Sequence, residues 1–479
     1  MADPLILSKP YREKTVWKMA FNASWGSFVF GYTLGEFNSP QPNIAATLGW
    51  GGDKDLYITI MSALMPLGAM FGALLGGPLA SKAGRRQAII YTDWIAIIGA
   101  GVIIIPFTPS FAIGRIITGF AAGSFTTLCP LYINETAPPE IGGKLGSLVQ
   151  LQVTLGIAVA YALALPLPTG DYNDHIFNYW WLCCFAFSGI IAFIQLLTFT
   201  FIYRQETPHW LLEKGKRDEA FKSLMQVYTE DGASNVLMTM EMGKKSATEL
   251  SETGSEKGSF HSRAEAEPTY QDLLFFRKGY SKMMRLGFML NILQQWSGIN
   301  AILSYSTTIY SGFGGGKFLA RLLTFITGLT NMVATLLVFP LIDKFGRKVL
   351  LWTGNLGMAV CLFLMGLFSD YIDAGVGPPL AFILIFLFFF EISSGPLCWV
   401  YCGEILAAKA MSLCVGTNWL CVFGVVFLFP IMSSGLGASG TFFFYAAICL
   451  FGAIYLMFDI VETRGISKPE IKVMLAKYR

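Results

Sequence analysis

The stretch SKAGRR, residues 81–86, returns in altered form as DKFGRK, residues 343–348. Two more pairs follow in the same order: YINE (132–135) matches YCGE (401–404), and QETPHW (205–210) matches VETRGI (461–466). Motifs that recur in order along a chain indicate a duplicated structural unit. A parallel duplication is typical of transporters whose solute site lies between the two copies, near the middle of the membrane.

The segments between these motifs are long and apolar. Hydrophobic residues make up 54% and charged residues 14% of the 479 residues, and the mean hydropathy is +0.55. Because about 20 apolar residues cross the hydrocarbon layer as a helix, we predict an all-α polytopic membrane protein with twelve spans. They are 16–37, 57–80, 88–107, 111–133, 145–167, 180–203, 285–311, 318–342, 349–369, 379–402, 411–433 and 440–460. Gly68, Gly72, Gly76, Gly119 and Gly123 would let neighbouring helices approach closely.

The repeats divide the chain into two six-helix bundles, residues 1–203 and 285–460, followed by a tail, 461–479. A polar insert, 204–284, separates the bundles. It begins with a stretch of helical periodicity and ends with TYQDLLFFRKGYSK, a candidate for another short helix. Residues 243–268, between these two parts, are rich in Ser, Glu and Lys and are predicted to be disordered.

Basic residues gather at one set of helix ends. They are Lys82, Arg85, Arg86, Lys144, Arg204, Lys344, Arg347, Lys348 and Arg464, together with a basic N-terminus. Because cytoplasmic loops carry an excess of Lys and Arg, we expect both termini in the cytoplasm. We expect the plasma membrane, with an organelle membrane as the alternative.

Composition disfavours several other classes of function. The net charge of +3 is too small to indicate a nucleic-acid partner. The 9 cysteines lie in apolar runs and the 3 histidines have no ligand spacing, so we expect no metal, no cofactor and no enzyme. The stretch GFGGGKF, residues 312–318, resembles a phosphate loop but has Phe318 where Ser or Thr is required, so ATP coupling is not expected.

Polar side chains within the predicted spans are the candidates for a solute site, because a carboxamide in hydrocarbon needs a hydrogen-bond partner or a wet cavity. They are Gln150, Gln294, Gln295, Asn300, Tyr305, Asn331, Glu391, Trp399, Asn418 and Trp419. The alternative for each is a hydrogen bond that joins helices. Their spread over five helices of both halves favours a shared polar chamber for a ligand rich in hydroxyls, with Gln294, Gln295 and Asn300 on successive turns.

Acidic residues lie near the basic residues at these helix ends, and together they suggest a second functional element. Opposite charges on separate helix ends pair when the halves close and part when they open. We therefore predict a cytoplasmic latch, with plain anchoring by positive charge as the alternative. Its members are Arg85, Arg86, Arg115, Glu135, Glu206, Arg347, Lys348, Glu404 and Glu462.

The chain resembles the sugar porter family of the major facilitator superfamily, and most closely its facilitative hexose transporters. The resemblance covers nearly the whole chain outside the insert and the tail. It rests on FGYTLGEFNSPQ (30–41), SKAGRR, GRIITGFAAGSFTTLCPLYINETAP (114–138), ETPHWLL (206–212), QQWSGINA (294–301), DKFGRK and VETRG. The family implies the twelve-helix major facilitator fold, a sugar substrate and a membrane environment.

The resemblance also implies roles for single residues. The residues it implies for sugar binding are Gln150, Gln294, Gln295, Asn300, Asn331, Glu391, Trp399 and Trp419. Gating falls to Phe30, Thr33, Tyr305, Gly395 and Pro396, with Tyr305 at the outer gate and Gly395–Pro396 at a bend in the tenth span.

Coupling depends on the first span. Proton-driven relatives carry an aspartate directly after the FGY triplet, where this chain has Thr33, so the resemblance favours uniport. A proton symporter using Glu36 or Glu391 is the second hypothesis. A sensor or a structural subunit of a larger assembly is the third, and a monomer is otherwise expected.

The chain also departs from the family pattern. Gly142 replaces an arginine, Ser304 a gating tyrosine, Cys398 and Val461 prolines, and Lys409 is the one cation in the loop after Glu404. These departures thin the predicted latch.

Overall fold

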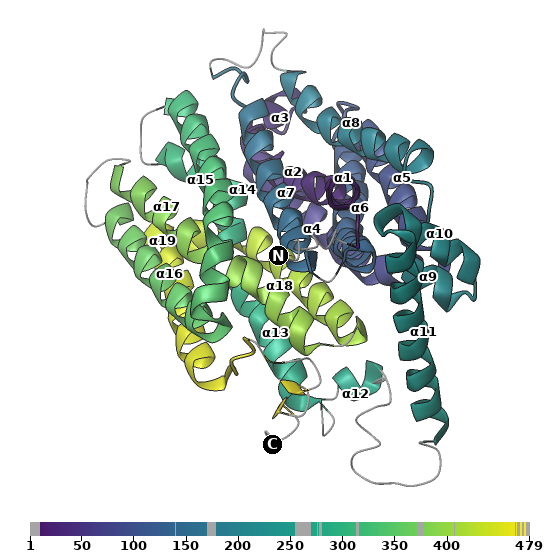
Figure 1. Cartoon of the computed structure of the whole chain (residues 1–479). Coiled ribbons are helices and arrows are strands. Elements are labelled where there is room, and N and C mark those ends of the chain that lie inside the picture. The colour runs from purple at the N-terminus through teal and green to yellow at the C-terminus, as the bar shows by residue number, and fades with distance from the viewer. Residues whose placement is uncertain are drawn as a thin grey trace, which may run out of the picture.

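The computed structural model describes residues 10–138, 140–169, 179–253, 270–274, 276, 280–312, 316–370, 377–406, 408–464, 466, 470, 471, 474 and 475. Within these ranges the chain is almost entirely helical and contains no strand. Two groups of long helices lie side by side, with α1–α8 in one and α13–α19 in the other (Figure 1). We call these groups the N-terminal half and the C-terminal half.

The helices have the following bounds. The N-terminal half comprises α1 Glu13–Ala23, α2 Trp25–Gly35, α3 Gln41–Thr47, α4 Lys54–Ala83, α5 Arg85–Ile103, α6 Thr108–Thr136, α7 Gly142–Leu163 and α8 Trp180–Phe201, with a 3-10 turn η1 at Gly51–Asp53. The insert comprises α9 Pro208–Glu213, α10 Arg217–Val227, α11 Glu230–Thr253 and α12 Tyr270–Leu274. The C-terminal half comprises α13 Ser281–Trp296, α14 Ile299–Gly312, α15 Gly316–Phe345, α16 Arg347–Asp370, α17 Gly377–Glu391, α18 Ser394–Ile405 and α19 Ala408–Asp459.

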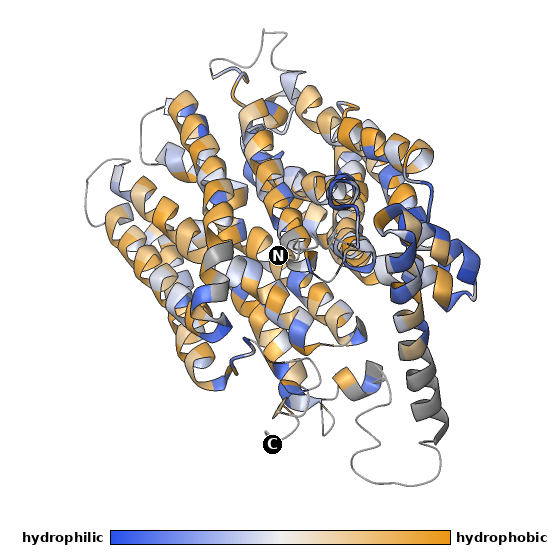
Figure 2. Cartoon of the chain, in the orientation of Figure 1, coloured by the Kyte–Doolittle hydropathy of each residue, from blue (hydrophilic) through white to orange (hydrophobic). Residues whose placement is uncertain are grey.

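The first ten predicted spans each coincide with one helix or with two consecutive helices, and the last two lie together in α19. Eight helices of the described ranges are long and apolar enough to cross a membrane. Hydrophobic residues dominate both halves, whereas hydrophilic residues gather on α9 and α10 (Figure 2). The prediction of an all-α polytopic membrane protein is confirmed.

Three of the predicted spans are not continuous helices. The first breaks at Ser24, the seventh at Ser297–Gly298, and the tenth at Ile392–Ser393. Gly298 has φ +90, a conformation that glycine adopts at little cost. Conversely, the last two predicted spans form one assigned helix, α19, whose backbone is non-helical at Gly437.

The predicted glycine contacts join α4 to α6. A Cβ added at Gly72 would lie 1.9 Å from the carbonyl oxygen of Phe120, and one at Gly123 would lie 1.9 Å from that of Ala69. Only hydrogen therefore fits at these positions, and the two backbones touch. Such contact replaces the hydrophobic effect as the source of attraction between helices in lipid.

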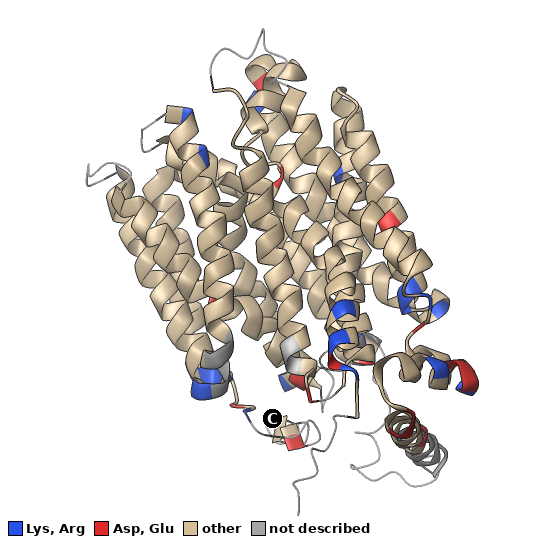
Figure 3. Cartoon of the chain, turned by 45° about the horizontal axis from the view of Figure 1, so that its top comes forward, with Lys and Arg blue, Asp and Glu red and all other residues tan. Residues whose placement is uncertain are grey.

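Most charged residues lie at one end of the bundle (Figure 3). We call the membrane face that carries Lys82, Arg85, Arg347 and Arg464 the basic face, and the other the opposite face. The insert helices lie at the basic face, and the N-terminus is tied to them because the Arg12 amide donates to the Val227 carbonyl over 2.6 Å. Helix α11 continues to Thr253, well into the stretch expected to be disordered, and residues 254–268 lie outside the described ranges.

An apolar core joins the two halves. It includes Met65 of α4 and Tyr161 of α7 together with Phe386 of α17 and Trp419 of α19. The polar residues predicted for the solute site lie within and around this shared core.

Candidate functional site

A chain of carboxamides links three helices of the C-terminal half. Gln295 donates to the Asn418 Oδ1 over 2.8 Å, and Asn418 donates to the Gln294 Oε1 over 2.7 Å. Asn300, beyond the break at Gly298, donates to the Gln295 Oε1. Gln294 also donates to the carbonyl oxygens of Ser394 and Gly395, at 2.9 and 3.0 Å. The amides of α13 are thus held in fixed orientations by α14, α18 and α19.

Two contacts join the N-terminal half to this region. Gln150 of α7 donates to the Glu391 Oε2 of α17 over 3.5 Å, and Thr335 of α15 donates to the same oxygen over 3.1 Å. Phe30 of α2 meets the Trp419 ring of α19 edge-on, with centroids 5.3 Å apart. The long Gln150 bond is weak by distance, so a ligand hydroxyl between the two side chains would replace it at small cost.

Two buried polar atoms near this region have no hydrogen-bond partner among the described residues. They are the indole Nε1 of Trp419 and the Oδ1 of Asn331. Both residues are nearly fully buried, at 3% and 2% exposure. Because most buried polar atoms are hydrogen-bonded, a donor and an acceptor left free are available to a bound molecule.

Other predicted residues have different surroundings. The Thr33 hydroxyl donates its proton to the Val29 carbonyl of its own helix over 2.6 Å, so that proton is not available to a ligand. Tyr305 donates to the Val426 carbonyl over 3.0 Å and stacks on Phe429. Trp399 is half-buried on α18. Pro396 lies inside α18, because the break falls at Ile392–Ser393, before the predicted Gly395–Pro396 bend.

The opposite face is closed by hydrogen bonds between the halves. Asn38, after α2, donates to the Leu303 carbonyl over 2.6 Å and to the Ser306 hydroxyl over 2.7 Å, and accepts from the Thr307 amide over 3.2 Å. Buried Arg321 of α15 donates to the carbonyl oxygens of Leu167 and Pro168. These contacts hold the first half of α14 and α15 against the N-terminal half.

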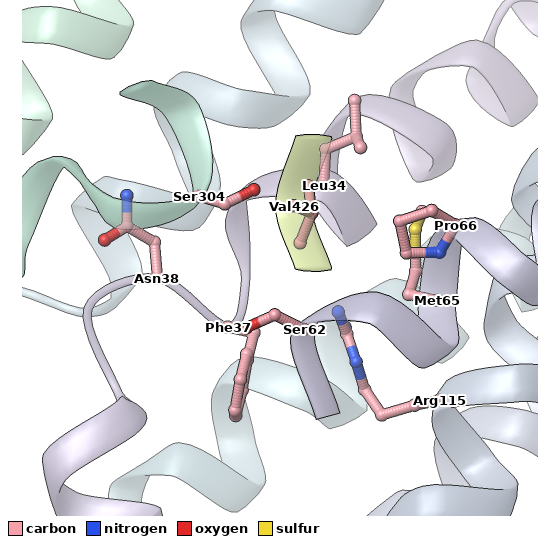
Figure 4. A pocket seen from close by; sticks show the side chains of 9 residues that line it. All are labelled: Leu34, Phe37, Asn38, Ser62, Met65, Pro66, Arg115, Ser304 and Val426. Atoms are coloured by element: carbon pink, nitrogen blue, oxygen red, sulfur yellow. The ribbon is translucent and has the colours of Figure 1, made fainter. Parts of the chain in front are cut away.

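A buried ion pair lies beside this closure. Arg115 of α6 donates to the Glu36 Oε1 over 3.1 Å, and the two side chains are 3% and 0% exposed. The guanidinium also lies 5.2 Å from the centre of the Phe37 ring. It borders a cavity of about 10 Å³, room for about one water, whose lining comes from both halves (Figure 4). The predicted assignment of Arg115 to the latch is wrong, because it lies about 30 Å along α6 from Glu135.

Comparison with known proteins identifies the family. The family sequence model described as "Sugar (and other) transporter" matches residues 19–475. The chain belongs to the sugar porter family of the major facilitator superfamily. This sugar porter is 31% identical to the facilitated trehalose transporter Tret1 of Bombyx mori, over 97% of this chain and 89% of that protein. It is also 31% identical to the plastidic glucose transporter 4 of Arabidopsis thaliana, over 95% of this chain and 79% of that protein.

Solved structures agree with this assignment. The sugar porter is similar to the xylose transporter XylE from E. coli in a partially occluded inward open conformation, with a TM-score of 0.78 and 25% identity over 95% of this chain and 100% of that one. It is also similar to XylE bound to 6-bromo-6-deoxy-D-glucose, with a TM-score of 0.79. The predictions of family and fold are confirmed.

The duplicated motifs of this sugar porter form two equivalent clusters at the basic face. In the N-terminal half, Arg85 pairs with Glu135 over 2.8 Å, and the Thr207 hydroxyl donates to the same carboxylate. In the C-terminal half, Arg347 pairs with Glu404 over 3.0 Å, and Thr463 takes the place of Thr207. The ion pairs of these two clusters, Arg85–Glu135 and Arg347–Glu404, each join residues of one half. The predicted pairing across the halves therefore stays a prediction for another conformation.

Glu206 and Glu462 complete the clusters by accepting backbone N–H groups. Glu206 accepts from the amides of Arg86 and Gln87, and Glu462 from those of Arg347 and Lys348. Burial raises the pKa of Glu206 despite these bonds. Burial also opposes ionisation of Glu462, but four backbone donors outweigh it and lower its pKa.

The opposite pKa shifts predict a difference in pH dependence. A lowered carboxyl pKa contributes stability above the ordinary range of carboxyl pKa values and is lost as the pH falls, whereas a raised pKa gives stability that grows as the pH falls. At about pH 7, Glu462→Gln should therefore lower the melting temperature more than Glu206→Gln, and the difference should shrink as the pH falls below the ordinary range of glutamate pKa values and Glu462 takes up a proton. Melting curves of the two purified variants against pH provide the measurement. An equal or larger loss in Glu206→Gln at neutral pH would contradict the assignment.

Several residues of the site were not predicted. Arg321, Asn38 and Thr335 each contact a predicted region, yet none was proposed as functional. For Arg321 the signal was visible, since an arginine inside a predicted span is costly unless it is paired. Asn38 and Thr335 carry no such signal, because single polar residues of this kind are common in membrane helices.

Proposed function

We propose that this sugar porter is a facilitative hexose uniporter that works by alternating access between residues 1–203 and 285–460. The observations that carry this are the oriented carboxamide chain of Gln294, Gln295 and Asn300 and the contact between the halves from Gln150 to Glu391. Polar atoms without a partner among the described residues, on Trp419 and Asn331, add a donor and an acceptor. Oriented donors and acceptors between two mobile halves suit a ligand with many hydroxyls. The facilitated trehalose and plastidic glucose transporters among the relatives support a sugar of this class.

The assignment of single residues belongs to this proposal. In it, the sugar contacts Gln150, Gln294, Gln295, Asn300, Asn331, Glu391, Trp399 and Trp419. Phe30 and Tyr305 move with the gates. The chain lies in the plasma membrane with both termini in the cytoplasm. Bound sugar replaces the Gln150–Glu391 contact. The free energy of sugar binding then changes the relative populations of the conformations that are open at the two faces. The clusters within each half keep each bundle rigid while the halves separate.

Transport into proteoliposomes tests the function. We expect saturable glucose exchange that neither sodium nor a protonophore alters, with competing hexoses ranked by inhibition. Liposomes with a protein of unrelated fold give the background. Absence of any saturable sugar uptake, in protein that melts cooperatively, would overturn the proposal.

The Glu36–Arg115 pair favours a second candidate, proton symport. Thr33 cannot carry a proton, but Glu36 lies one turn further along the span, is buried, and leaves its Oε2 without a partner among the described residues. In this candidate the carboxyl takes up a proton when Arg115 moves away. Uptake that collapses with a protonophore, and that becomes insensitive to it in Glu36→Gln, would favour symport over uniport.

The closure of the opposite face predicts an effect on the balance of conformations. Asn38→Ala removes three hydrogen bonds between the halves, each worth about 1 kcal/mol, so the population open at the opposite face should rise by about 100-fold. Labelling of a cysteine at Ser304, which lines the cavity between the halves and whose side chain does not bond Asn38, by a membrane-impermeant reagent should quicken accordingly. Thr59→Ala is the control, because its hydroxyl bonds only its own helix. Equal labelling in both variants would count against this role of Asn38.

A further inference from the structure

A groove of about 460 Å³ opens on the outer surface of the N-terminal half between α1 and α8. Aromatic side chains spaced one turn apart form one wall: Trp17, Phe21 and Trp25. Ile202 and Tyr203, at the end of α8, form the other. Phe21 is 45% and Ile202 66% exposed, and both belong to membrane-spanning segments, so the groove faces lipid.

The groove lies at the level of the lipid headgroups on the basic face. Helix α8 ends at Phe201 and is followed by exposed Arg204, and α1 begins at Glu13, only one turn before Trp17. Trp and Tyr are typical of this depth, where one end of the ring is apolar and the other wet. A molecule in the groove would thus have one part in hydrocarbon and one among the headgroups.

Its polar part carries a positive charge and a free donor. Exposed Lys18 lines the groove, and in the described part of the chain no carboxylate does so. Asn22 is 95% buried at its base; its Oδ1 accepts from the Thr198 hydroxyl, while its Nδ2 has no partner among the described residues. An ammonium and an amide N–H side by side form a site for an anion, and the apolar walls exclude a freely soluble one.

We propose that this groove binds one anionic glycerophospholipid from the leaflet at the basic face. The phosphate accepts hydrogen bonds from Lys18 and Asn22, and an acyl chain lies along Phe21, Trp25 and Ile202. Basic pockets between membrane helices recognise anionic headgroups in this way. A zwitterionic headgroup fits less well, because its ammonium finds no carboxylate among the lining residues of the described chain and is repelled by Lys18. Both walls belong to the N-terminal half, so the lipid stabilises the packing of α1 on α8 without joining the halves.

Native mass spectrometry of the full chain released from detergent tests this site. Phosphatidylglycerol and phosphatidylcholine with identical acyl chains are compared on the wild type, on Lys18→Ala and on Lys14→Ala. Lys14 is an exposed lysine of the same helix that does not line the groove, so its replacement changes the charge equally. We expect one phosphatidylglycerol to be retained by the wild type and by Lys14→Ala, and about fivefold weaker retention by Lys18→Ala.

Two outcomes would overturn the proposal. One is equal loss of phosphatidylglycerol in the two lysine variants, which would indicate a diffuse surface charge. The other is equal retention of phosphatidylcholine and phosphatidylglycerol by the wild type. A second variant, Phe21→Ala, should weaken both lipids, because it removes contact with the acyl chain. A cooperative melting curve of each variant shows that the protein is folded, so this test does not depend on whether the chain transports sugar.

Discussion

Gln295→Ala is expected to weaken hexose binding by about 100-fold, the largest effect of any single change in the proposed chamber. Gln295 lies at the centre of the carboxamide chain, where it donates to Asn418 and accepts from Asn300. Its removal takes away its proposed hydrogen bonds to the sugar and the two bonds that hold Asn418 and Asn300 in their orientations. Two to three hydrogen bonds to the sugar at about 1 kcal/mol each, about 3 kcal/mol in all, correspond to the stated loss of affinity.

Gln195→Ala provides the matched control. Gln195 is an equally buried glutamine, on α8, and it donates to the carbonyl oxygens of Asn22 and Ala23, away from the proposed chamber. It should cost stability but leave the sugar dissociation constant unchanged. Calorimetric titration with glucose measures both variants, and a double variant of Gln150 and Gln295 should abolish binding. Similar affinities in Gln295→Ala and Gln195→Ala would remove the carboxamide chain from the binding site.

Glu36→Ala is expected to lower the free energy of unfolding by about 3–5 kcal/mol, because it leaves the Arg115 guanidinium charged and buried. The remaining contacts of Arg115, a 3.3 Å bond to the Met61 carbonyl and the Phe37 ring, are too weak to replace a carboxylate. Glu36→Gln, which keeps an acceptor of the same shape, should cost less. Unfolding curves in detergent give the comparison.

The double variant Glu36→Leu with Arg115→Met distinguishes the ion pair from a general packing defect. A buried ion pair can often be exchanged for apolar residues of similar volume without loss, because the cost of desolvating two charges disappears with them. The double variant should therefore be more stable than Glu36→Ala alone. If it were less stable, packing around the pair rather than the uncompensated charge would explain the loss.

The sequence was sufficient for the spans, the glycine contacts and the set of amides, because these depend on local hydropathy and residue type. The breaks were harder to foresee. At Ser24 the nearby Gly26 lies in a continuous apolar run, so neither hydropathy nor composition marks the α1–α2 break there. At Gly298 the Ser-Gly pair was visible, but apolar residues continue on both sides, so hydropathy alone gives one continuous span.

The sequence also does not predict which carboxylate pairs with each arginine. Composition places Arg85 and Arg347 near carboxylates at the basic face, but it does not say whether a carboxylate of the same half or of the other half lies within reach. The loop after α4 packs against the end of α6 and the segment after α8, so Arg85 meets Glu135. Arg115 was misplaced for a related reason, since position along a span determines the membrane face and the residue type does not.

The self-contained clusters at the basic face have one more consequence. Because Glu135 and Glu206 are satisfied by residues before 214, and Glu404 and Glu462 by residues after 346, a polypeptide severed in the insert would sacrifice none of these bonds. Two fragments expressed from separate genes would each retain the ion pairs and hydrogen bonds of their own cluster. They would associate through the shared apolar core and the hydrogen bonds around Asn38.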